Sequence, residues 1–543
     1  MRRTRALGRF EIGVLVAALA VVLAACGGDT EAETTTTAGG ETTTTTAPTT
    51  ETTEAATTTT EAGPIASGTL TVGASNALIT FDPHASQSGS QLQFIEPVFD
   101  KLIRDLPNGE LTPGLATSWG WTNDERTELT LEIREGVTFH DGADLTADVV
   151  AANILRARDA AGPRGAGLAG ITDAVATGPL TVIVSLEAPA PALPNDFANV
   201  VGMMISPNQL EGDAVERAPI GTGPWIYDAE NSVVGEQYFY NLNPDYWDPS
   251  VQGVESIVVL ELPDDDARIN ALLGGQIDMA IIRPNQVVQA EGAGLTVISS
   301  PERWYGLTLA DRNGTVIPEL GDVRVRQALN FAVDRQAIVD ATQFGIGAPT
   351  VQIFPPGGMG HDPALEDFYT YDPDRARELL AEAGVTNLTL PTVTLAALST
   401  PVEAIGEYLR DIGITLEIGI LEPGTLGAAA RSTENPTTMF AYGQPDPSLD
   451  VSGILLENAP YNPFKTVNPD IARLAEEGAA GDTFEERNAA YQEISRIVSE
   501  EAWFLPVYFG HVVAAHADRV RGASFHLSRG FAPVSYLGVT VDE

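Results

Sequence analysis

Cysteine is almost absent from this sequence, because the 543 residues contain only Cys26. A single cysteine excludes intrachain disulfide bonds and every metal site built from several thiolates. Histidine is also scarce, with six residues scattered along the chain. Only His511 and His516 lie close together, and on one strand a separation of five residues would point them to opposite faces. Metal sites need several such ligands at short, repeating spacing, so we expect no metal ion and no cofactor.

Basic residues are far outnumbered by acidic ones. The chain has 30 lysine and arginine residues against 74 aspartate and glutamate residues, which gives a formal charge of −44. Nucleic-acid binding depends on neutralising phosphates with basic side chains. The composition therefore argues against nucleic acid as a partner.

Long hydrophobic runs are missing except near the N-terminus. Four arginines precede an apolar run from Ile12 to Ala25, which ends at Cys26 in the sequence LAAC. This run is too short to span a membrane and has the order of a secretory signal peptide, which we place at residues 1–25. LAAC resembles the lipobox of bacterial lipoproteins, in which the cysteine becomes lipidated. The alternative is a signal peptide that ends near a buried cysteine.

Residues 26–66 form a second distinctive segment. It consists mostly of threonine, glutamate, alanine and glycine and offers almost no apolar surface to bury. Such a segment cannot offset the entropy lost on ordering. We predict that Cys26 is lipidated and that a disordered, Thr-rich stalk holds the folded body off a membrane surface.

The remainder of the chain mixes strand and helix patterns. Strands are predicted within residues 68–75, 128–139, 178–188 and 254–263, where β-forming residues alternate or run together. Helices are predicted within 92–103, 145–158, 322–343, 372–384 and 482–504. In two of them the ends are marked, by Asp372 before Pro373 and by a capping box of Thr483 and Glu486. Asp144 or Thr146 is available to cap the helix at 145–158. We predict an α/β protein.

Two short motifs suggest chemistry but have simpler explanations. His140 and Asp141 could form a base and its orienting partner. A strand precedes them and Gly142 follows, which favours a turn instead. GAGLAG (165–170) matches G-x-G-x-x-G, but it follows helix-like sequence and is interpreted as a loop. The sequence has no G-x-S-x-G elbow. We predict no catalytic residues.

Four segments in order resemble the extracellular solute-binding proteins of ABC importers, in the peptide/nickel class called family 5. They are LEIREGVTFHDGADLTADVV (131–150), APIGTGPWIYDAENSVVGEQYFYNLNPDYW (218–247), DDDARINALLGGQIDMA (264–280) and DVRVRQALNFAVDRQAIV (322–339). The resemblance covers nearly everything from Gly68 to the C-terminus. It implies that the FHDG turn is part of the scaffold.

The resemblance implies a two-lobed fold of the periplasmic-binding-protein type, class II, with an extra subdomain in the first lobe. The first lobe would comprise residues 67–108, 219–310 and 507–543, the inserted subdomain 109–218 and the second lobe 311–506. The hinge would lie near RWYGLTLA (303–310) and LPVYFGHVV (505–513).

The resemblance also implies where the ligand binds. The family places contacts in the loop after the first strand, at the first crossing and in a second-lobe loop that ends in an acidic residue and proline. The candidates in this chain are Phe81, Ser88, Trp304, Tyr305, Tyr442, Gln444 and Asp446. For each aromatic residue, core packing is the alternative.

One position departs from the pattern of the family's peptide receptors. Those receptors carry an aspartate three residues before the acidic-proline pair, and it binds the amino terminus of the ligand. Here that position is Gly443. A buried ammonium group without a carboxylate is costly. We therefore predict that the protein is not an ordinary peptide receptor, or that Asp446 or Asp82 supplies the missing carboxylate.

The function implied is a receptor that captures a peptide-like or other small polar solute and delivers it to a membrane ABC permease. The protein would be a monomer on the outer face of the cytoplasmic membrane, anchored through Cys26, and would not be an enzyme. The alternatives are a secreted hydrolase and a chaperone-like binding protein on the same scaffold.

Overall fold

The computed structural model describes residues 67–86, 91–106, 110–160, 168–444, 446–481, 483–525 and 535–542. The signal peptide, Cys26, the Thr-rich stalk, Ser88 and the first half of GAGLAG lie outside these residues and stay predictions. Residues 61–543 form one unit. Within its described part, we find no helix with the length and apolar character needed to cross a membrane.

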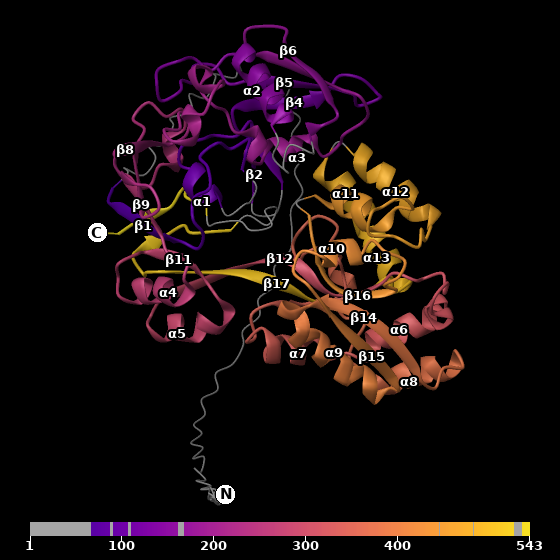
Figure 1. Cartoon of the computed structure of the whole chain (residues 1–543). Coiled ribbons are helices and arrows are strands. Elements are labelled where there is room, and N and C mark those ends of the chain that lie inside the picture. The colour runs from indigo at the N-terminus through magenta and orange to yellow at the C-terminus, as the bar shows by residue number, and fades with distance from the viewer. Residues whose placement is uncertain are drawn as a thin grey trace, which may run out of the picture. The chain divides into compact units, whose positions relative to one another are not determined.

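An eleven-stranded mixed sheet forms the framework of this unit (Figure 1). Ten strands follow the order β15-β14-β16-β12-β17-β11-β1-β10-β9-β8, and β13 pairs with β17. The strands are β1 (Thr69–Ala74), β8 (Trp225–Val233), β9 (Gln237–Leu242), β10 (Ser256–Glu261), β11 (Met279–Ile282), β12 (Thr296–Leu309), β13 (Ala348–Pro349), β14 (Leu388–Leu395), β15 (Ile414–Leu421), β16 (Thr437–Tyr442) and β17 (Phe504–His516).

The long antiparallel strands β12 and β17 connect the two halves of this sheet. One large hydrophobic core is built mainly from residues 70–259 and 514–541, and a second from residues 307–508. The register of β12 against β17 shifts between Pro301 and Arg303 and again between Tyr305 and Gly306. Such irregularities bend strands locally. Both predicted hinge segments lie on these two strands, while the lobe boundaries stay predictions.

A smaller antiparallel sheet, which we call the small sheet, has the order β4-β5-β7-β6. Its strands are β4 (Ala116–Trp121), β5 (Glu128–Ile133), β6 (Ile171–Ala176) and β7 (Thr181–Leu186). Alternate residues of β5 and β7 are buried, and α2 (Ala147–Asp159) packs on this sheet. β4 is its edge strand. Two short pairs complete the described strands: β2 (Ile103–Asp105) with β3 (Leu111–Pro113), and β18 (Val520–Arg521) with β19 (Thr540–Val541).

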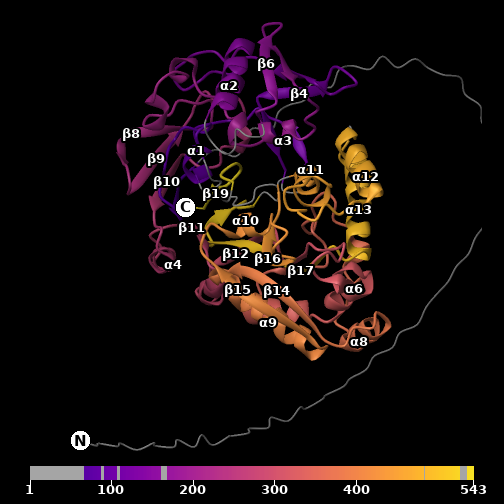
Figure 2. The same cartoon turned by 45° about the vertical axis from the view of Figure 1, so that its right-hand side comes forward.

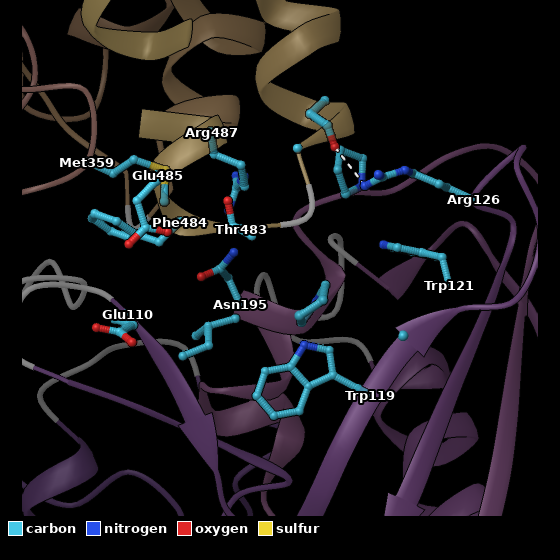
Figure 3. A pocket seen from close by; sticks show the side chains of 16 residues that line it. Glu110, Trp119, Trp121, Arg126, Asn195, Met359, Thr483, Phe484, Glu485 and Arg487 are labelled. Atoms are coloured by element: carbon cyan, nitrogen blue, oxygen red, sulfur yellow. Dashed lines mark hydrogen bonds between the residues drawn. The ribbon is translucent and has the colours of Figure 1, made fainter. Parts of the chain in front are cut away.

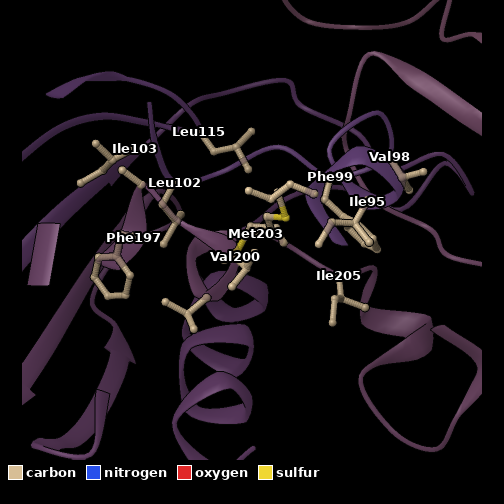
Figure 4. Packing of buried hydrophobic residues seen from close by; sticks show 14 of the residues in the cluster. Ile95, Val98, Phe99, Leu102, Ile103, Leu115, Phe197, Val200, Met203 and Ile205 are labelled. Atoms are coloured by element: carbon tan, nitrogen blue, oxygen red, sulfur yellow. The ribbon is translucent and has the colours of Figure 1, made fainter. Parts of the chain in front are cut away.

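The core next to the small sheet is close-packed and apolar. Figure 4 shows side chains from α1 (Leu92–Ile95), β2 and the segment after α3 (Leu193–Phe197) in contact with one another. Ile95, Val98, Leu102 and Val200 each have an exposed fraction of 1% or less. Burial of this apolar surface holds α3 against the rest of the unit.

The remaining helices pack on the main sheet or against one another (Figure 2). They are α4 (Asp265–Leu273), α5 (Val287–Gly292), α6 (Val323–Phe331), α7 (Arg335–Thr342), α8 (Pro373–Glu382), α9 (Ser399–Asp411), α10 (Leu426–Ala429), α11 (Pro447–Asp450), α12 (Pro469–Ala480) and α13 (Phe484–Glu500). A π-helical turn at Val451–Leu455 follows α11.

The predicted helix ends are confirmed where a side chain caps the helix. Thr146, and not Asp144, accepts a hydrogen bond from the Val149 N–H at the start of α2. Asp372 caps α8, which has Pro373 as its first residue. The capping box of Thr483 and Glu486 opens α13.

Two helix predictions are wrong in extent. The predicted helix at 322–343 is two helices, because the Asp334 side chain accepts the Ala337 N–H and starts a new helix after α6 has ended. The predicted helix at 92–103 stops at Ile95. Pro97 lacks an N–H group and restricts the residue before it, so the helix cannot continue.

Candidate functional site

A cavity of about 560 Å³ lies between the small sheet and the helices α12 and α13 (Figure 3). Its volume is typical of small-molecule sites. The wall combines residues that are far apart in the sequence: Glu110, Leu111, Trp119, Gly120, Trp121, Arg126, Pro191, Pro194, Asn195, Met359, Ala479, Gly481, Thr483, Phe484, Glu485 and Arg487.

The strand β4 contributes an aromatic wall to this cavity. Trp119 and Trp121 are two residues apart, so their side chains lie on the same face of the strand. Both are half-buried and pack against the core of the small sheet. Across the cavity, Phe484 begins α13 and Met359 lies beside it (Figure 3). Large apolar faces are therefore available on both sides.

A buried ion pair lies at the boundary of the cavity. Arg487 Nη2 donates to both Asp446 oxygens, at 2.7 and 2.8 Å. Asn195 Nδ2, from α3, donates to Asp446 Oδ2 at 2.9 Å, and the N–H and hydroxyl of Ser448 donate to Asp446 Oδ1. The exposed fraction of the side chain is 2% for Asp446 and 13% for Arg487. The network joins α3 to α13 through one carboxylate.

The electrostatic state of Arg487 follows from this pairing. Burial by itself would lower the pKa of the guanidinium group. The charge of Asp446, together with the interaction with Tyr491 and the hydrogen bonds to both residues, outweighs this effect and raises the pKa of Arg487 above its usual value. Arg487 Nε also donates to the Gly478 carbonyl at 3.1 Å. Its charge is therefore balanced by a protein carboxylate.

A second arginine links the two walls of the cavity. Arg126 Nη1 donates to the Ala479 carbonyl at 3.2 Å, and Nη2 donates to the Ala480 carbonyl. These carbonyls belong to the last turn of α12, where carbonyl groups lack partners within the helix. A cation at this end also interacts favourably with the helix dipole.

The described residues that we predicted as ligand contacts do not line this cavity. Phe81 is buried against Tyr227 and Tyr238, with ring centroids 4.7 and 5.9 Å away. Trp304 is fully buried. Tyr305 stacks on Tyr508 at 5.1 Å. These three aromatic side chains pack against other aromatic side chains of the protein.

The candidates in the second-lobe loop also do not line the cavity. Tyr442 is buried beside Phe440 and Tyr461. Gln444 is exposed, and Asp446 is held in the network with Arg487 and Asn195. Asp446 therefore borders the cavity through its partners. A direct role in ligand contact stays a prediction for each of these residues.

The FHDG segment is a turn, as predicted. Gly142 has φ +83° and its N–H donates to the Phe139 carbonyl. His140 Nε2 contacts the Gly223 carbonyl at 2.9 Å, and Asp141 accepts from Ser206 and Asn208. Burial lowers the pKa of His140. The two side chains bind different partners, which is the behaviour of scaffold residues.

The described residues include no group of three or more histidine, cysteine or acidic side chains placed to hold a metal ion. His511 instead contacts Ser299 Oγ through Nδ1 at 3.0 Å, and His516 contacts the Ala517 carbonyl.

The residues that do line the cavity were not predicted from the sequence. The signal available for β4 was Trp-Gly-Trp at 119–121, two large aromatic residues on one strand face beside polar residues. No comparable signal marked Asn195 or Arg487. Asn195 lies 251 residues from Asp446 in the sequence, and Arg487 lies 41 residues from it. Their contribution therefore depends on contacts between distant parts of the chain.

Curated relatives align with most of this chain and over nearly their whole length. The glutathione-binding protein GsiB of Escherichia coli (strain K12) is 25% identical over 496 residues, which span 86% of this chain and 94% of GsiB. The GsiB protein of Shigella dysenteriae serotype 1 is also 25% identical over 496 residues, with the same coverage.

Solved structures confirm the predicted two-lobed α/β fold. HbpA2 from Haemophilus parasuis is 21% identical, with a TM-score of 0.79, and covers 88% of this chain and 100% of its own. The murein-tripeptide-binding protein MppA, in its unliganded open form, is 20% identical with a TM-score of 0.78 and covers 88% and 98%.

The family model described as bacterial extracellular solute-binding proteins, family 5 Middle, matches residues 110–457. This stretch includes the small sheet, β12 and the loop that holds Asp446. The chain therefore belongs to the family 5 extracellular solute-binding proteins.

Proposed function

We propose that this protein is the substrate-binding receptor of an ABC importer and that it captures a small solute in the cavity between the small sheet and α12–α13. The proposal rests on the composition of the cavity wall, which comes from two parts of the structure. One side comes from β4 and α3 and the other from α12 and α13. A ligand that contacts both sides favours the closed arrangement by its differential affinity, and a membrane permease can read that closure.

The ligand, we propose, is not recognised through a free amino terminus. At Gly443, a Cβ atom would lie 3.0 Å from Arg303 Cβ and 3.2 Å from the Glu302 carbonyl oxygen. A side chain at this position would require β12 to give by a few tenths of an ångström. The carboxylate that the family's peptide receptors use is absent here because glycine has no side chain, and Arg303 lies directly beside this position.

The two carboxylates that could replace it are already engaged. Asp446 is bound by Arg487, Asn195 and Ser448. Asp82 is bound by Arg156, with Nη2 to Oδ2 at 2.6 Å. Releasing either one for a ligand would leave a largely buried arginine without its carboxylate partner. Glutathione and peptides, named for the relatives, carry a free amine, so we do not transfer those ligands to this chain.

Lipidation at Cys26 would tether the receptor to the outer face of the membrane, and residues 26–66 would act as its stalk.

The hydrolase alternative would need a nucleophile and a base in contact, and the only pair that the sequence suggested, His140 and Asp141, binds separate partners. We propose a monomeric receptor without enzymatic activity.

Tryptophan fluorescence can test this proposal. Trp225, Trp304 and Trp503 are buried to 1% exposure or less, and Trp247 is covered by Arg104 and Arg134. Trp119 and Trp121 should therefore dominate any spectral response to a ligand. Adding a small-molecule extract of the native host should shift the emission and yield the bound compound chemically unchanged. Conversion of the compound, or the absence of any saturable response, would contradict a receptor.

A further inference from the structure

The small sheet and the helix pair α12–α13 are built on separate hydrophobic cores. Buried residues of β5 and β7, such as Leu129 and Val184, belong to one cluster. Buried residues of α12 and α13, such as Leu474 and Ile494, belong to another. Parts of a protein that do not share a core are free to move unless the contacts at their boundary hold them. The cavity lies at this boundary.

The first contact at the boundary is a helix cap that comes from the opposite part. α12 is followed by Gly481, whose backbone is extended (φ −62°, ψ 136°) and not left-handed. A left-handed residue at this point would let the following N–H groups bond the last carbonyls of the helix. In α12, the carbonyls of Ala479 and Ala480 accept from Arg126, which lies in the turn between β4 and β5. The end of α12 therefore loses a donor when the small sheet moves away.

The turn that carries Arg126 is strained and yet firmly held. Arg126 has φ +52°, a left-handed conformation that is uncommon for residues other than glycine. The Asn123 carbonyl accepts the Arg126 N–H, and the Asn123 side chain accepts the N–H groups of Thr127 and Glu128. A strained residue that its surroundings hold in place is typical of functional positions. The turn thus fixes the point from which the guanidinium group reaches α12.

The second contact lies at the Asp446 carboxylate. Asn195 Nδ2, from α3, donates to Asp446 Oδ2 at 2.9 Å, while Arg487 of α13 donates to both oxygens of the same carboxylate. The ion pair of Asp446 and Arg487 stays complete without Asn195. The hydrogen bond from Asn195 can therefore break and re-form as the two parts separate and approach. Asn195 and Arg126 both line the cavity, so both contacts lie beside it.

We propose that these two contacts hold the small sheet against α12 and α13 when no solute is bound, so that the ligand-free receptor is mainly closed. Both contacts join protein groups to protein groups and need no solute. A solute then enters and leaves only after the contacts of Arg126 and Asn195 have broken. The contacts slow capture and release, and they raise affinity because the closed arrangement is already populated. This inference goes beyond the proposed function, in which the solute supplies the preference for closure.

Double electron–electron resonance tests the proposal in protein refolded from urea to remove any bound solute. Cys26 is the only cysteine, so a chain with Cys26→Ser can carry spin labels at Val175→Cys on β6 and Glu476→Cys on α12. Both positions are exposed. The chain with both contacts intact should give mainly the short distance of the closed arrangement. Arg126→Ala and Asn195→Ala should each raise the ratio of long to short distances by about tenfold, because each removes one hydrogen-bonded contact.

Controls separate closure from other effects. Arg410→Ala removes an arginine side chain that is 61% exposed on α9 and should leave the distances unchanged. Arg126→Lys should restore part of the closed population, because an ammonium group still donates to carbonyls. Hydrogen exchange in the last turn of α12 provides a second readout. Faster exchange in Arg126→Ala with unchanged distances would assign Arg126 to capping of α12 alone and overturn the proposal.

The chain with both contacts intact tests the proposal even if a variant fails to fold. Mainly long distances in this ligand-free chain would overturn the proposal, as would the same distribution in the double variant of Arg126 and Asn195. No solute takes part in the measurement, so its failure leaves the receptor function standing. Failure of every compound in a native-host extract to bind would contradict the receptor function and leave the measured closure unaffected.

Discussion

The Asp446→Asn substitution tests the buried network that joins α3 to α13. The amide keeps the size of the carboxylate but removes its charge, so the Arg487 guanidinium stays buried without a counter-ion. Both Arg487 contacts are short, at 2.7 and 2.8 Å, and the carboxylate is 2% exposed. Removing one partner of a buried ion pair costs about 3–5 kcal/mol.

Urea unfolding measures this cost. The free energy of unfolding in water should fall by about 3–5 kcal/mol, with an unchanged dependence on urea concentration. The exposed pair of Asp470 and Arg473 is a matched control, with side chains 63% and 53% exposed. Asp470→Asn should cost about 0–1 kcal/mol, because solvent screens this pair.

A double-mutant cycle identifies the source of the effect. Arg487→Gln should also destabilise the protein, whereas the pair of changes together should cost less than the sum of the two. The coupling between partners in one network is typically about 0.5–3 kcal/mol. A change within 0.5 kcal/mol for Asp446→Asn, or strict additivity in the cycle, would refute the reasoning.

Further predictions concern other parts of the chain. Burial, followed by the charge of Arg156, lowers the pKa of His84 from 6.5 to about 4. Between these values the unfolded chain binds more protons, so stability is fully present above pH 6.5 and falls as the pH drops to 4, by about 3 kcal/mol for this group. His84→Gln should flatten the plot of unfolding free energy against pH in this window, and an unchanged slope would exclude this origin. His140→Ala should lower stability by about 1–2 kcal/mol through loss of the bond to the Gly223 carbonyl and leave ligand affinity alone; weaker binding at an unchanged melting temperature would assign the turn to the site. Cys26→Ser should release the protein from the membrane without unfolding the body, as fractionation and circular dichroism can check; a variant that stays in the membrane fraction would reveal another anchor.

Local features of the fold could be predicted from the sequence because they depend on neighbouring residues. The helix α13 starts at the capping box of Thr483 and Glu486, and α8 starts at Asp372 and Pro373. Each of these signals lies within one helical turn. The break between α6 and α7 was missed, because the apolar spacing continues through it while Asp334 starts a second helix. Periodicity reports which face is buried and does not report a cap inside the pattern.

The candidate site was less accessible to sequence reasoning. The loop that contains Asp446 was identified through its resemblance to a family, but the residue's partners come from α3 and α13. Such long-range pairing has no local signature. The aromatic candidates Phe81 and Trp304 were chosen by position, and both are buried to 1% exposure or less. An aromatic residue in a loop can serve a core or a ligand, and sequence alone does not distinguish these uses.

Native mass spectrometry of the protein purified from its own host tests the central claim most directly. We expect a 1:1 complex with one small molecule, released chemically unchanged on denaturation, and the loss of that complex when Trp119 and Trp121 are both replaced by alanine. Recovery of only the ligand-free mass under conditions that preserve non-covalent complexes, or of the same complex in the double variant, would contradict a receptor that binds its solute in this cavity.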